Sequence, residues 1–237
     1  MTSRIVIIPA RGGSKRIPKK NIKDFLGQPI ISYSIENAIK SELFDEIHVS
    51  TDDDEIFSIA SNLGAKPKFK RSSALAGDSI PIMDVLREVQ EEYESLGLYY
   101  DEIWLLMPCA PLLEVTDLIS ASTLFASELN SEAMMSVCEY PAPIEWAFNM
   151  DPMSHKLVPV DGNSFIEPSQ SLKKAYFDTG SFCIFRADFI KKFINNESYK
   201  NFHGFLLPKH KSVDIDDMDD WLFAEKLFIA NKKINAQ

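Results

Sequence analysis

The chain has 237 residues, of which 45% are hydrophobic and 25% charged, and its formal net charge at pH 7 is −10. These fractions match ordinary globular domains and exclude disordered, coiled-coil and fibrous classes, while the length favours one domain with an insertion. No apolar run is long enough to span a bilayer, and residues 1–10 lack the apolar core of a signal peptide.

Short apolar runs alternate with amphipathic stretches along most of the chain. The β-branched run at residues 5–8 predicts a fully buried parallel strand. Further strands are expected at residues 47–50, 66–69, 103–107, 133–137, 181–185, 205–207 and 213–216. Helices are expected from Pro29 onward, after Asp53 as the N-cap, and over residues 81–96, 116–127, 187–195 and 219–231. This order predicts an α/β fold of Rossmann-like type, with a mostly parallel central sheet and helices on both faces.

Residues 139–170 interrupt this pattern. Four prolines fall between Pro141 and Pro159, a fifth is Pro168, and the aromatic side chains follow no sustained period. We therefore expect residues 1–237 to form a single domain in which residues 139–170 are an inserted arm, a hairpin used for dimer contact or as a lid.

The positive charge of the chain is concentrated in one segment. Residues 11–23 carry six basic side chains and no acidic one, while the other 19 basic and 35 acidic residues leave −16 on the rest of the chain. An acidic body disfavours nucleic acid, which proteins bind by neutralising many phosphates along an extended surface. A compact basic loop favours a small polyanion instead.

This basic loop follows the first predicted strand. In doubly wound folds, ligands bind beyond the carboxyl ends of strands, where the chain reads Ala10-Arg11-Gly12-Gly13-Ser14-Lys15-Arg16. The two glycines allow backbone amides to approach phosphate oxygens closely. The neighbouring cations, which would neutralise a triphosphate, are Arg11, Lys15, Arg16 and Lys20. The loop matches neither the Walker A nor the G-x-G-x-x-G motif, so an ordinary basic surface turn remains the alternative.

Two carboxylates near the C-terminus are candidate magnesium ligands. Asp214 and Asp216 alternate with apolar residues, so in an extended segment both face the same side. Mg²⁺ typically takes one or two carboxylates together with phosphate oxygens and water. Asp219 and Asp220 are expected to cap or complement the last helix. Residues 52–54 are a second acidic run, for which helix capping is the favoured interpretation and metal binding the alternative.

The segment from Ile8 to Asn21 resembles the nucleotide-binding signature of the CMP-sialic acid synthetase family, and so do residues 49–52, 71–78, 105–112 and 212–216. The resemblance implies a fold of the nucleotide-diphospho-sugar transferase type and a CTP substrate. It implies that Arg11, Lys20 and Asn21 contact the triphosphate and ribose, and that Arg71 reads cytosine. Asp78 and Ser79 would belong to the same nucleotide site, and Asp214 and Asp216 would hold Mg²⁺.

Within that family, residues 169–172 and 175–182 resemble the pseudaminic acid cytidylyltransferase branch. The chain departs from the branch at Pro168, where arginine is usual, at Phe177, where histidine is usual, and in a shorter segment after Asp78. The candidates for the sugar-acid pocket are Gln170, Tyr176, Asp178 and Phe182.

The expected reaction joins CMP from CTP to the anomeric hydroxyl of a nine-carbon sugar acid and releases pyrophosphate. The sequence leaves the sugar open between pseudaminic, sialic or legionaminic acid and 3-deoxy-octulosonate, and it identifies no general base. The alternatives are a non-catalytic nucleotide-binding protein and a glycosyltransferase with a DxD metal site. We expect a homodimer with no nucleic-acid or membrane partner. Three widely spaced cysteines indicate free thiols in a reducing cytoplasm.

Overall fold

The centre of the molecule is a six-stranded sheet. The computed structural model describes residues 2–65, 67–128, 130–160, 168, 170–193, 198, 200 and 202–235. The strand order is β10 (Phe202–Leu206), β6 (Ala133–Glu139), β9 (Tyr176–Arg186), β5 (Glu102–Leu106), β1 (Arg4–Pro9) and β4 (Glu46–Ser50). All of these strands run in one direction except β9, which is antiparallel to both β5 and β6.

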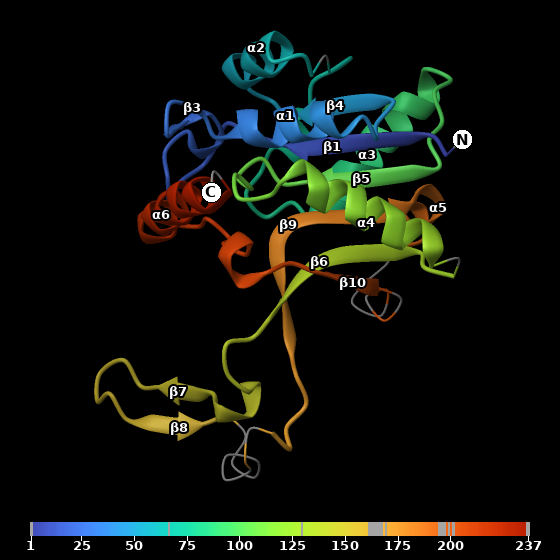
Figure 1. Ribbon diagram of the computed structural model, residues 1–237. Coiled ribbons are helices and arrows are strands. Elements are labelled where there is room, and N and C mark those ends of the chain that lie inside the picture. The colour runs from blue at the N-terminus through green and yellow to red at the C-terminus, as the bar shows by residue number, and fades with distance from the viewer. Residues whose placement is uncertain are drawn as a thin grey trace.

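Helices cover both faces of this sheet (Figure 1). One face packs against α1 (Ile31–Ser41), α2 (Asp54–Asn62) and α4 (Val115–Ser127), and the other against α3 (Ile82–Ser95) and α5 (Ala187–Lys192). The apolar run of β1 serves both layers, because Val6 and Ile8 point to the first face while Ile5 and Ile7 point to the second. The predicted fold class, a mostly parallel α/β sheet between helical layers, is confirmed.

A third, smaller core joins the N-terminal and C-terminal parts of the chain. Phe25 of the short hairpin β2 (Asp24–Phe25) and β3 (Gln28–Pro29) packs edge-on against Trp221 and Phe228 of α6 (Met218–Asn235), with ring centroids 5.3 and 5.7 Å apart. Ile17 and Ile215 are buried in the same cluster. This packing brings the basic loop close to the segment that carries Asp214 and Asp216.

The structure corrects four predicted elements. Pro29 ends the β2–β3 hairpin, and α1 begins two residues later. Residues 67–69 form no strand, while Lys66 lies outside the described residues. Residues 213–216 are extended but pair with no strand. The helix expected over residues 187–195 ends at Lys192, and residues 194–195 fall outside the description.

The arm leaves the body on extensions of two sheet strands. Figure 1 shows β6 and β9 bending away from the sheet toward a hairpin of β7 (Phe148–Met150) and β8 (Leu157–Pro159). A short 3-10 turn, Ile144–Trp146, precedes the hairpin. The hairpin falls inside the segment expected to be an arm, of which residues 161–167 and 169 lie outside the description. Within the described chain, no helix is both long and apolar enough to cross a bilayer.

Candidate active site

A cavity of about 230 Å³ opens beyond the carboxyl ends of β1 and β5. It lies where ligands bind in open α/β sheets. Residues from distant parts of the chain line it: Pro9, Arg11, Ser14, Lys20, Asn21, Arg71, Leu75, Gly77, Asp78, Ile80, Ile82, Val85, Met107, Pro108, Cys109, Gly180 and Asp214. The cavity therefore brings together the basic loop, Arg71 and the first of the two candidate metal carboxylates.

The glycines of the loop have different surroundings. The Gly12 amide donates to Asp52 Oδ1 at 3.1 Å, and a Cβ on Gly12 would lie 2.7 Å from Asp53 Oδ2. Gly12 is thus required for close approach to the acidic turn after β4. A Cβ on Gly13 would meet nothing within 4 Å, so this residue leaves the loop open to solvent.

Asn21 ties the loop to the turn after β5. Its side-chain amide nitrogen donates to the Arg11 carbonyl at 2.9 Å, and the Cys109 thiol donates to its Oδ1 at 3.4 Å. Burial raises the pKa of Cys109 to about 12, so the thiol keeps its proton at neutral pH and can act as this donor. Asn21 therefore fixes the shape of the loop in addition to lining the cavity.

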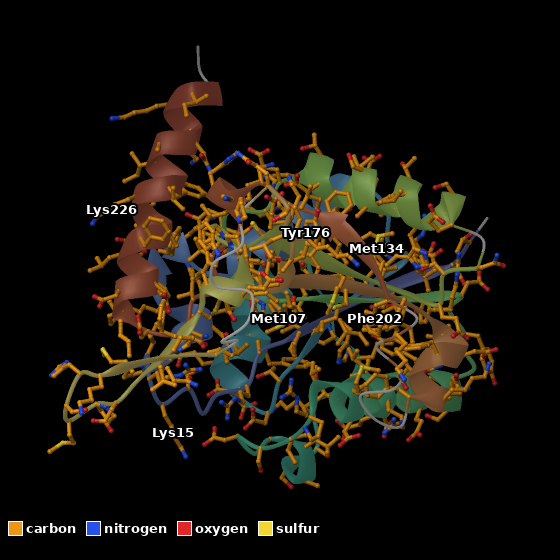
Figure 2. All side chains as sticks on the ribbon, turned by 90° about the horizontal axis from the view of Figure 1, so that it is seen from below. Lys15, Met107, Met134, Tyr176, Phe202 and Lys226 are labelled. Carbon is orange, nitrogen blue, oxygen red and sulfur yellow. The ribbon has the colours of Figure 1, made fainter. Side chains whose placement is uncertain are left out.

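The loop cations reach acidic side chains on two sides. Arg11 and Lys15 both pair with Asp78. Arg16 Nη2 lies 2.7 Å from Asp216 Oδ1, while Lys20 Nζ donates to the Ile215 carbonyl at 2.6 Å and lies 4.0 Å from the same Asp216 oxygen. Figure 2 shows Lys15 at the rim of the molecule, away from Met107. The loop thus spans the distance between the Asp78 turn and the C-terminal acidic segment.

Asp214 and Asp216 face the same side, as their alternation predicts, because Ile215 between them is buried on the other side. The Asp214 carboxyl packs against Gly180, where a Cβ would lie 3.0 Å from Asp214 Cγ. This partial burial raises the pKa of Asp214, and the Asp216 charge raises it further, while Lys20 opposes both effects. Among the described residues, no cation lies within ion-pair distance of Asp214.

The remaining acidic residues have structural roles. Asp217 caps α6 by accepting from the backbone amides of Asp219 and Asp220, and Asp220 accepts from those of Asp216 and Asp217. The capping prediction is confirmed for Asp220, while Asp219 lies in the first turn, where its charge complements the helix dipole.

The acidic run after β4 also serves structure. Asp53 caps α2 through the amides of Glu55 and Ile56, which confirms the predicted N-cap. Asp54 pairs with Lys70, and Asp52 accepts from Gly12. No group of three or more metal-ligating side chains gathers among the described residues.

Arg71 is held rigidly at the cavity wall. Only 7% of its surface is exposed. Its Nε donates to Ser50 Oγ at 3.0 Å, and its Nη2 donates to the Ser50 carbonyl at 2.9 Å. Burial lowers the pKa of Arg71, while the charges of Asp52 and Glu88 act in the opposite direction. The guanidinium is therefore fixed by β4 in a cavity that the apolar side chains Leu75 and Ile80 also line.

Three candidates for the sugar-acid pocket lie at the start of β9 or in the turn before it. Tyr176 and Asp178 lie on the part of β9 that leads to the arm, and Gln170 is exposed in a turn before that strand. Asp178 Oδ1 accepts from the Gly180 amide at 2.9 Å, and burial raises the pKa of its carboxyl. Figure 2 shows Tyr176 and Met107 near the centre of one face.

Eleven of the predicted site residues do not line the cavity: Ala10, Gly12, Gly13, Lys15, Arg16, Ser79, Gln170, Tyr176, Asp178, Phe182 and Asp216. Phe182 is 1% exposed and stacks on Trp104 with centroids 6.0 Å apart, so it is a core residue and not part of a sugar pocket. Ala10 is fully buried, and its amide donates to the Ser50 carbonyl at 2.9 Å. Ser79 is exposed beside the cavity-lining residues Asp78 and Ile80.

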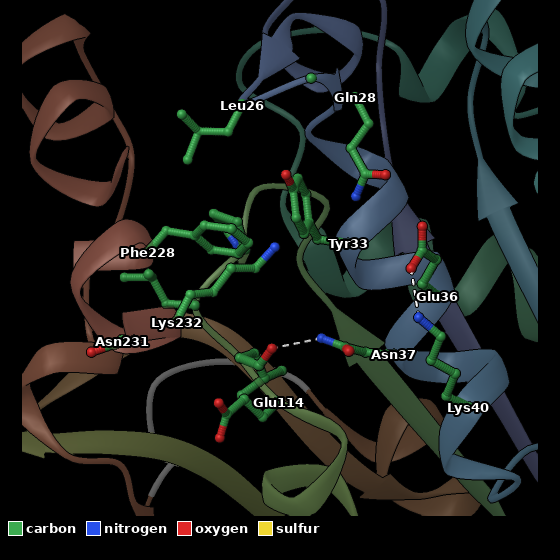
Figure 3. A pocket seen from close by; sticks show the side chains of 14 residues that line it. Leu26, Gln28, Tyr33, Glu36, Asn37, Lys40, Glu114, Phe228, Asn231 and Lys232 are labelled. Atoms are coloured by element: carbon green, nitrogen blue, oxygen red, sulfur yellow. Dashed lines mark hydrogen bonds and ion pairs between the residues drawn. The ribbon is translucent and has the colours of Figure 1, made fainter. Parts of the chain in front are cut away.

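A second cavity, of about 450 Å³, lies between α1 and α6 and shares no lining residue with the first (Figure 3). Its polar groups already serve the fold. Tyr33 Oη donates to the Phe25 carbonyl at 2.7 Å, Asn37 Nδ2 donates to the Leu113 carbonyl at 2.6 Å, and Lys40 pairs with Glu36 at 2.7 Å. The smaller cavity is therefore the better candidate for chemistry.

Cys109 and Gly180 line the cavity but were not predicted as site residues. Both had a detectable signal. Cys109 follows the carboxyl end of a predicted strand, where ligands bind. Gly180 is an isolated glycine next to strand residues, a position that often marks close backbone approach.

Comparison with known proteins defines the class of this fold and site. The structure matches that of CMP:2-keto-3-deoxy-manno-octonic acid synthetase complexed with CTP, with a TM-score of 0.73 and 16% identity, over 97% of this chain and 100% of the other. The two chains therefore share one fold. Residues 5–203 match the family model described as Cytidylyltransferase.

Two relatives of known name are similar over nearly their whole length. The pseudaminic acid cytidylyltransferase of Campylobacter jejuni is 38% identical, over 96% of this chain and 97% of the relative. The CMP-N,N'-diacetyllegionaminic acid synthase of Legionella pneumophila is 28% identical, over 97% of each chain. The chain belongs to the cytidylyltransferase family, as the resemblance of its loop to CMP-sialic acid synthetases implies, and it is an enzyme of the nucleotidyltransferase class.

Proposed function

We propose that the enzyme transfers CMP from CTP to the anomeric hydroxyl of a nonulosonic acid, pseudaminic acid first among them, and releases pyrophosphate. The observation that carries this proposal is that loop cations, Arg71 and Asp214 line one and the same cavity. The cavity is lined by cationic side chains, which suit a triphosphate, and by apolar side chains and the fixed Arg71 guanidinium, which suit a base.

The triphosphate would bind along the basic loop. Arg11, Lys15, Arg16 and Lys20 pair here with Asp78, Asp216 and a carbonyl, and phosphate oxygens would compete for the same donors. Backbone amides of the loop, including Gly13 and Ser14, would add donors without side-chain bulk. Arg71, which lines the same cavity, would direct its remaining donors toward the oxygen of a cytosine ring.

Asp214 and Asp216 fit a magnesium site by the chemistry of their donors. They are carboxylates on one side of a short segment, beside a cationic loop that would hold phosphate oxygens. Mg²⁺ prefers one or two carboxylates completed by phosphate and water. When bound, the ion would neutralise negative charge on the α-phosphate and on departing pyrophosphate.

In the reaction, the anomeric oxygen forms a bond to the α-phosphorus with loss of the hydroxyl proton. The bond between the α-phosphorus and the oxygen bridging to the β-phosphate breaks, and pyrophosphate leaves. Arg11 and Lys20 stabilise the charge that grows on the phosphate oxygens, and the fixed loop orients the nucleotide for in-line attack. The base that takes the proton is not assigned.

The choice of sugar acid is supported by similarity to the Campylobacter jejuni enzyme, whose name specifies pseudaminic acid. The candidate contacts for the sugar are Tyr176 and Asp178, on the part of β9 that leads to the arm, and Gln170, in the turn before that strand.

The proposal is tested by pyrophosphate release from CTP and Mg²⁺ with pseudaminic, legionaminic, sialic and 3-deoxy-octulosonic acids. We expect the highest kcat/KM with pseudaminic acid. A clear preference for another acid would correct the sugar assignment. Binding of CTP without turnover on any acid would favour a non-catalytic nucleotide-binding protein, and sugar transfer from a nucleotide donor without pyrophosphate would favour a glycosyltransferase.

We further propose that the enzyme is a homodimer held together by the arm, and that it acts in the cytoplasm, where CTP is available and thiols stay reduced. Met150 pairs with Leu157, and Phe148 pairs with Pro159, so one face of the hairpin is apolar. All four side chains are exposed. An isolated two-stranded hairpin is marginally stable in water, which favours a second copy as its cover.

A further inference from the structure

Asp214 and Asp216 lie on a segment that no sheet holds in place. Within the described chain, residues 212–216 connect the 3-10 turn Lys209–Lys211 to α6 and pair with no strand. At the C-terminal end of this segment, Asp220 Oδ2 accepts from the amides of Asp216 and Asp217, and in the middle Ile215 is buried. The N-terminal end, next to Asp214, needs an anchor of its own.

Lys211 provides that anchor. Its Nζ lies 2.6 Å from Glu114 Oε2, and 2.8 and 3.0 Å from the two carboxylate oxygens of Asp117. The Lys211 side chain is only 11% exposed. Glu114 and Asp117 form the capping box of α4, which packs on the central sheet. The ion triad therefore joins the acidic segment to a rigid part of the fold, three residues before Asp214.

The triad is favourable only when it is complete. The lysine between two carboxylates compensates their charges, and its removal would leave two adjacent like charges, of which Asp117 is mostly buried and Glu114 is exposed. Without the triad the turn would move away from α4, because within the described chain the other hydrogen bonds of Lys209–Lys211 go to its own neighbours and to Asn231 of α6. Such movement would shift Asp214 relative to Lys20 and Gly180.

We propose that Lys211 is a positioning residue for the metal-binding carboxylates: through Glu114 and Asp117 it fixes the distance between Asp214 and the basic loop. The inference rests on the proposed function, in which Asp214 and Asp216 hold the cation. Removing a group that orients metal ligands without touching the metal commonly weakens metal affinity by about 10- to 100-fold.

The test measures Mn²⁺ binding in the presence of CTP, without sugar acid, from the electron paramagnetic resonance signal of free Mn²⁺. We expect Lys211→Met to weaken Mn²⁺ binding about 10-fold or more, and Lys211→Arg, which keeps the charge and the donors, to restore most of it. Lys191→Met is the matched control, because it removes a 2.7 Å ion pair to Glu94 that joins α5 to α3 on the other face of the sheet. It should leave Mn²⁺ affinity unchanged.

If Lys211→Met fails to fold, Glu114→Gln replaces it, since this change keeps Lys211 paired with Asp117 and should give a smaller loss in the same direction. A folded Lys211→Met protein that binds Mn²⁺ as tightly as wild type would overturn the proposed role of Lys211 but not the proposed metal site. The same result in Glu114→Gln, if that variant is needed, would have the same meaning. Failure of the wild-type enzyme to bind Mn²⁺ with CTP would overturn the proposed metal site as well.

Discussion

His48 and Arg71 show how burial acts on two basic side chains in one part of the fold. Arg71 has Ser50 as a partner for two of its nitrogens, and guanidinium is too basic to lose its proton in a protein. His48 is fully buried against Phe69 and Tyr93. Burial first, and then the charges of Lys68 and Arg71, lower the pKa of His48 to about 3. His48 is therefore a neutral core residue in the folded enzyme.

This pKa predicts a pH-dependent part of the stability. Between about pH 6.5, the ordinary value for histidine, and about pH 3, the unfolded chain binds a proton at His48 that the folded chain does not. The free energy of unfolding therefore falls as the pH falls through this window. From pH 7 to pH 4.5, His48 should account for about 2 to 3 kcal/mol of the loss.

Urea unfolding of wild type and His48→Gln at both pH values measures this contribution. Glutamine can keep a hydrogen bond to Tyr93 but does not titrate, so the variant should lose less stability on acidification. Equal losses in the two proteins would show that His48 does not titrate as described.

Single residues were predictable from the sequence where local chemistry decides their role. Asp53 precedes a helix and caps it, and the alternation of Asp214 with Ile215 correctly placed the carboxylates on the solvent side. Phe182 was not predictable, because whether a strand residue points to the core or to a ligand depends on what packs above the strand. Phe182 contacts Trp104 of β5 and Phe205 of β10 and is buried in the core.

At the scale of elements, periodic segments and the mostly parallel sheet were predicted correctly, whereas the direction of one strand was not predictable. The strand at residues 5–8 and the helix at residues 81–96 match β1 and α3 within two residues. The strand at residues 181–185 belongs to β9, but nothing in its pattern shows that it runs antiparallel between β5 and β6. Residues 213–216 alternate like a strand because Ile215 is buried and Val213 packs against the same cluster, without a neighbouring strand.

Gly180 of β9 packs closely against Asp214 of the acidic segment, and this contact can be tested. Its φ is +62°, and a Cβ there would lie 3.0 Å from Asp214 Cγ. Gly97 has a φ of +77° with nothing within 4 Å. Alanine at either position should lower the free energy of unfolding by about 1 to 2 kcal/mol, the cost of a left-handed backbone for an L residue.

Only Gly180→Ala should also raise the Mg²⁺ concentration needed for half-maximal turnover, because only this Cβ displaces Asp214. Urea unfolding and Mg²⁺ titrations of CMP transfer compare the two variants. A Gly97→Ala protein with the same change in Mg²⁺ dependence would mean that the effect comes from strain and not from contact with Asp214.

At the scale of the whole molecule, two features organise the enzyme: the aromatic cluster that draws α6 against the basic loop, and the arm that carries β7 and β8 away from the body (Figure 1). The prolines and the broken periodicity of residues 139–170 predicted an arm. They could not predict which strand residues pair, because three-residue strands are too short to show a period.

The apolar face of the arm hairpin predicts that the enzyme is a dimer. Replacing Met150 and Leu157 together by aspartate places two charges on the apolar face of the hairpin, where they would be desolvated in a dimer. Light scattering coupled to gel filtration should then report a monomer, while the wild type should report a dimer. Asn149→Asp, on the opposite face of the hairpin, is the control and should stay dimeric. A double variant with the mass of the wild type would contradict the proposed interface.

The proposed function requires the basic loop and the C-terminal carboxylates to act on one magnesium-bound triphosphate. The most direct test is the rate of CMP-sugar formation, followed by ³¹P nuclear magnetic resonance, in Asp216→Asn and Asp219→Asn. Asp216 contacts Arg16 of the loop, whereas Asp219 lies in the first turn of α6. We predict a loss of about 100-fold or more for Asp216→Asn, typical of removing a group that stabilises transition-state charge, and little change for Asp219→Asn. Equal rates in the two variants would contradict the account.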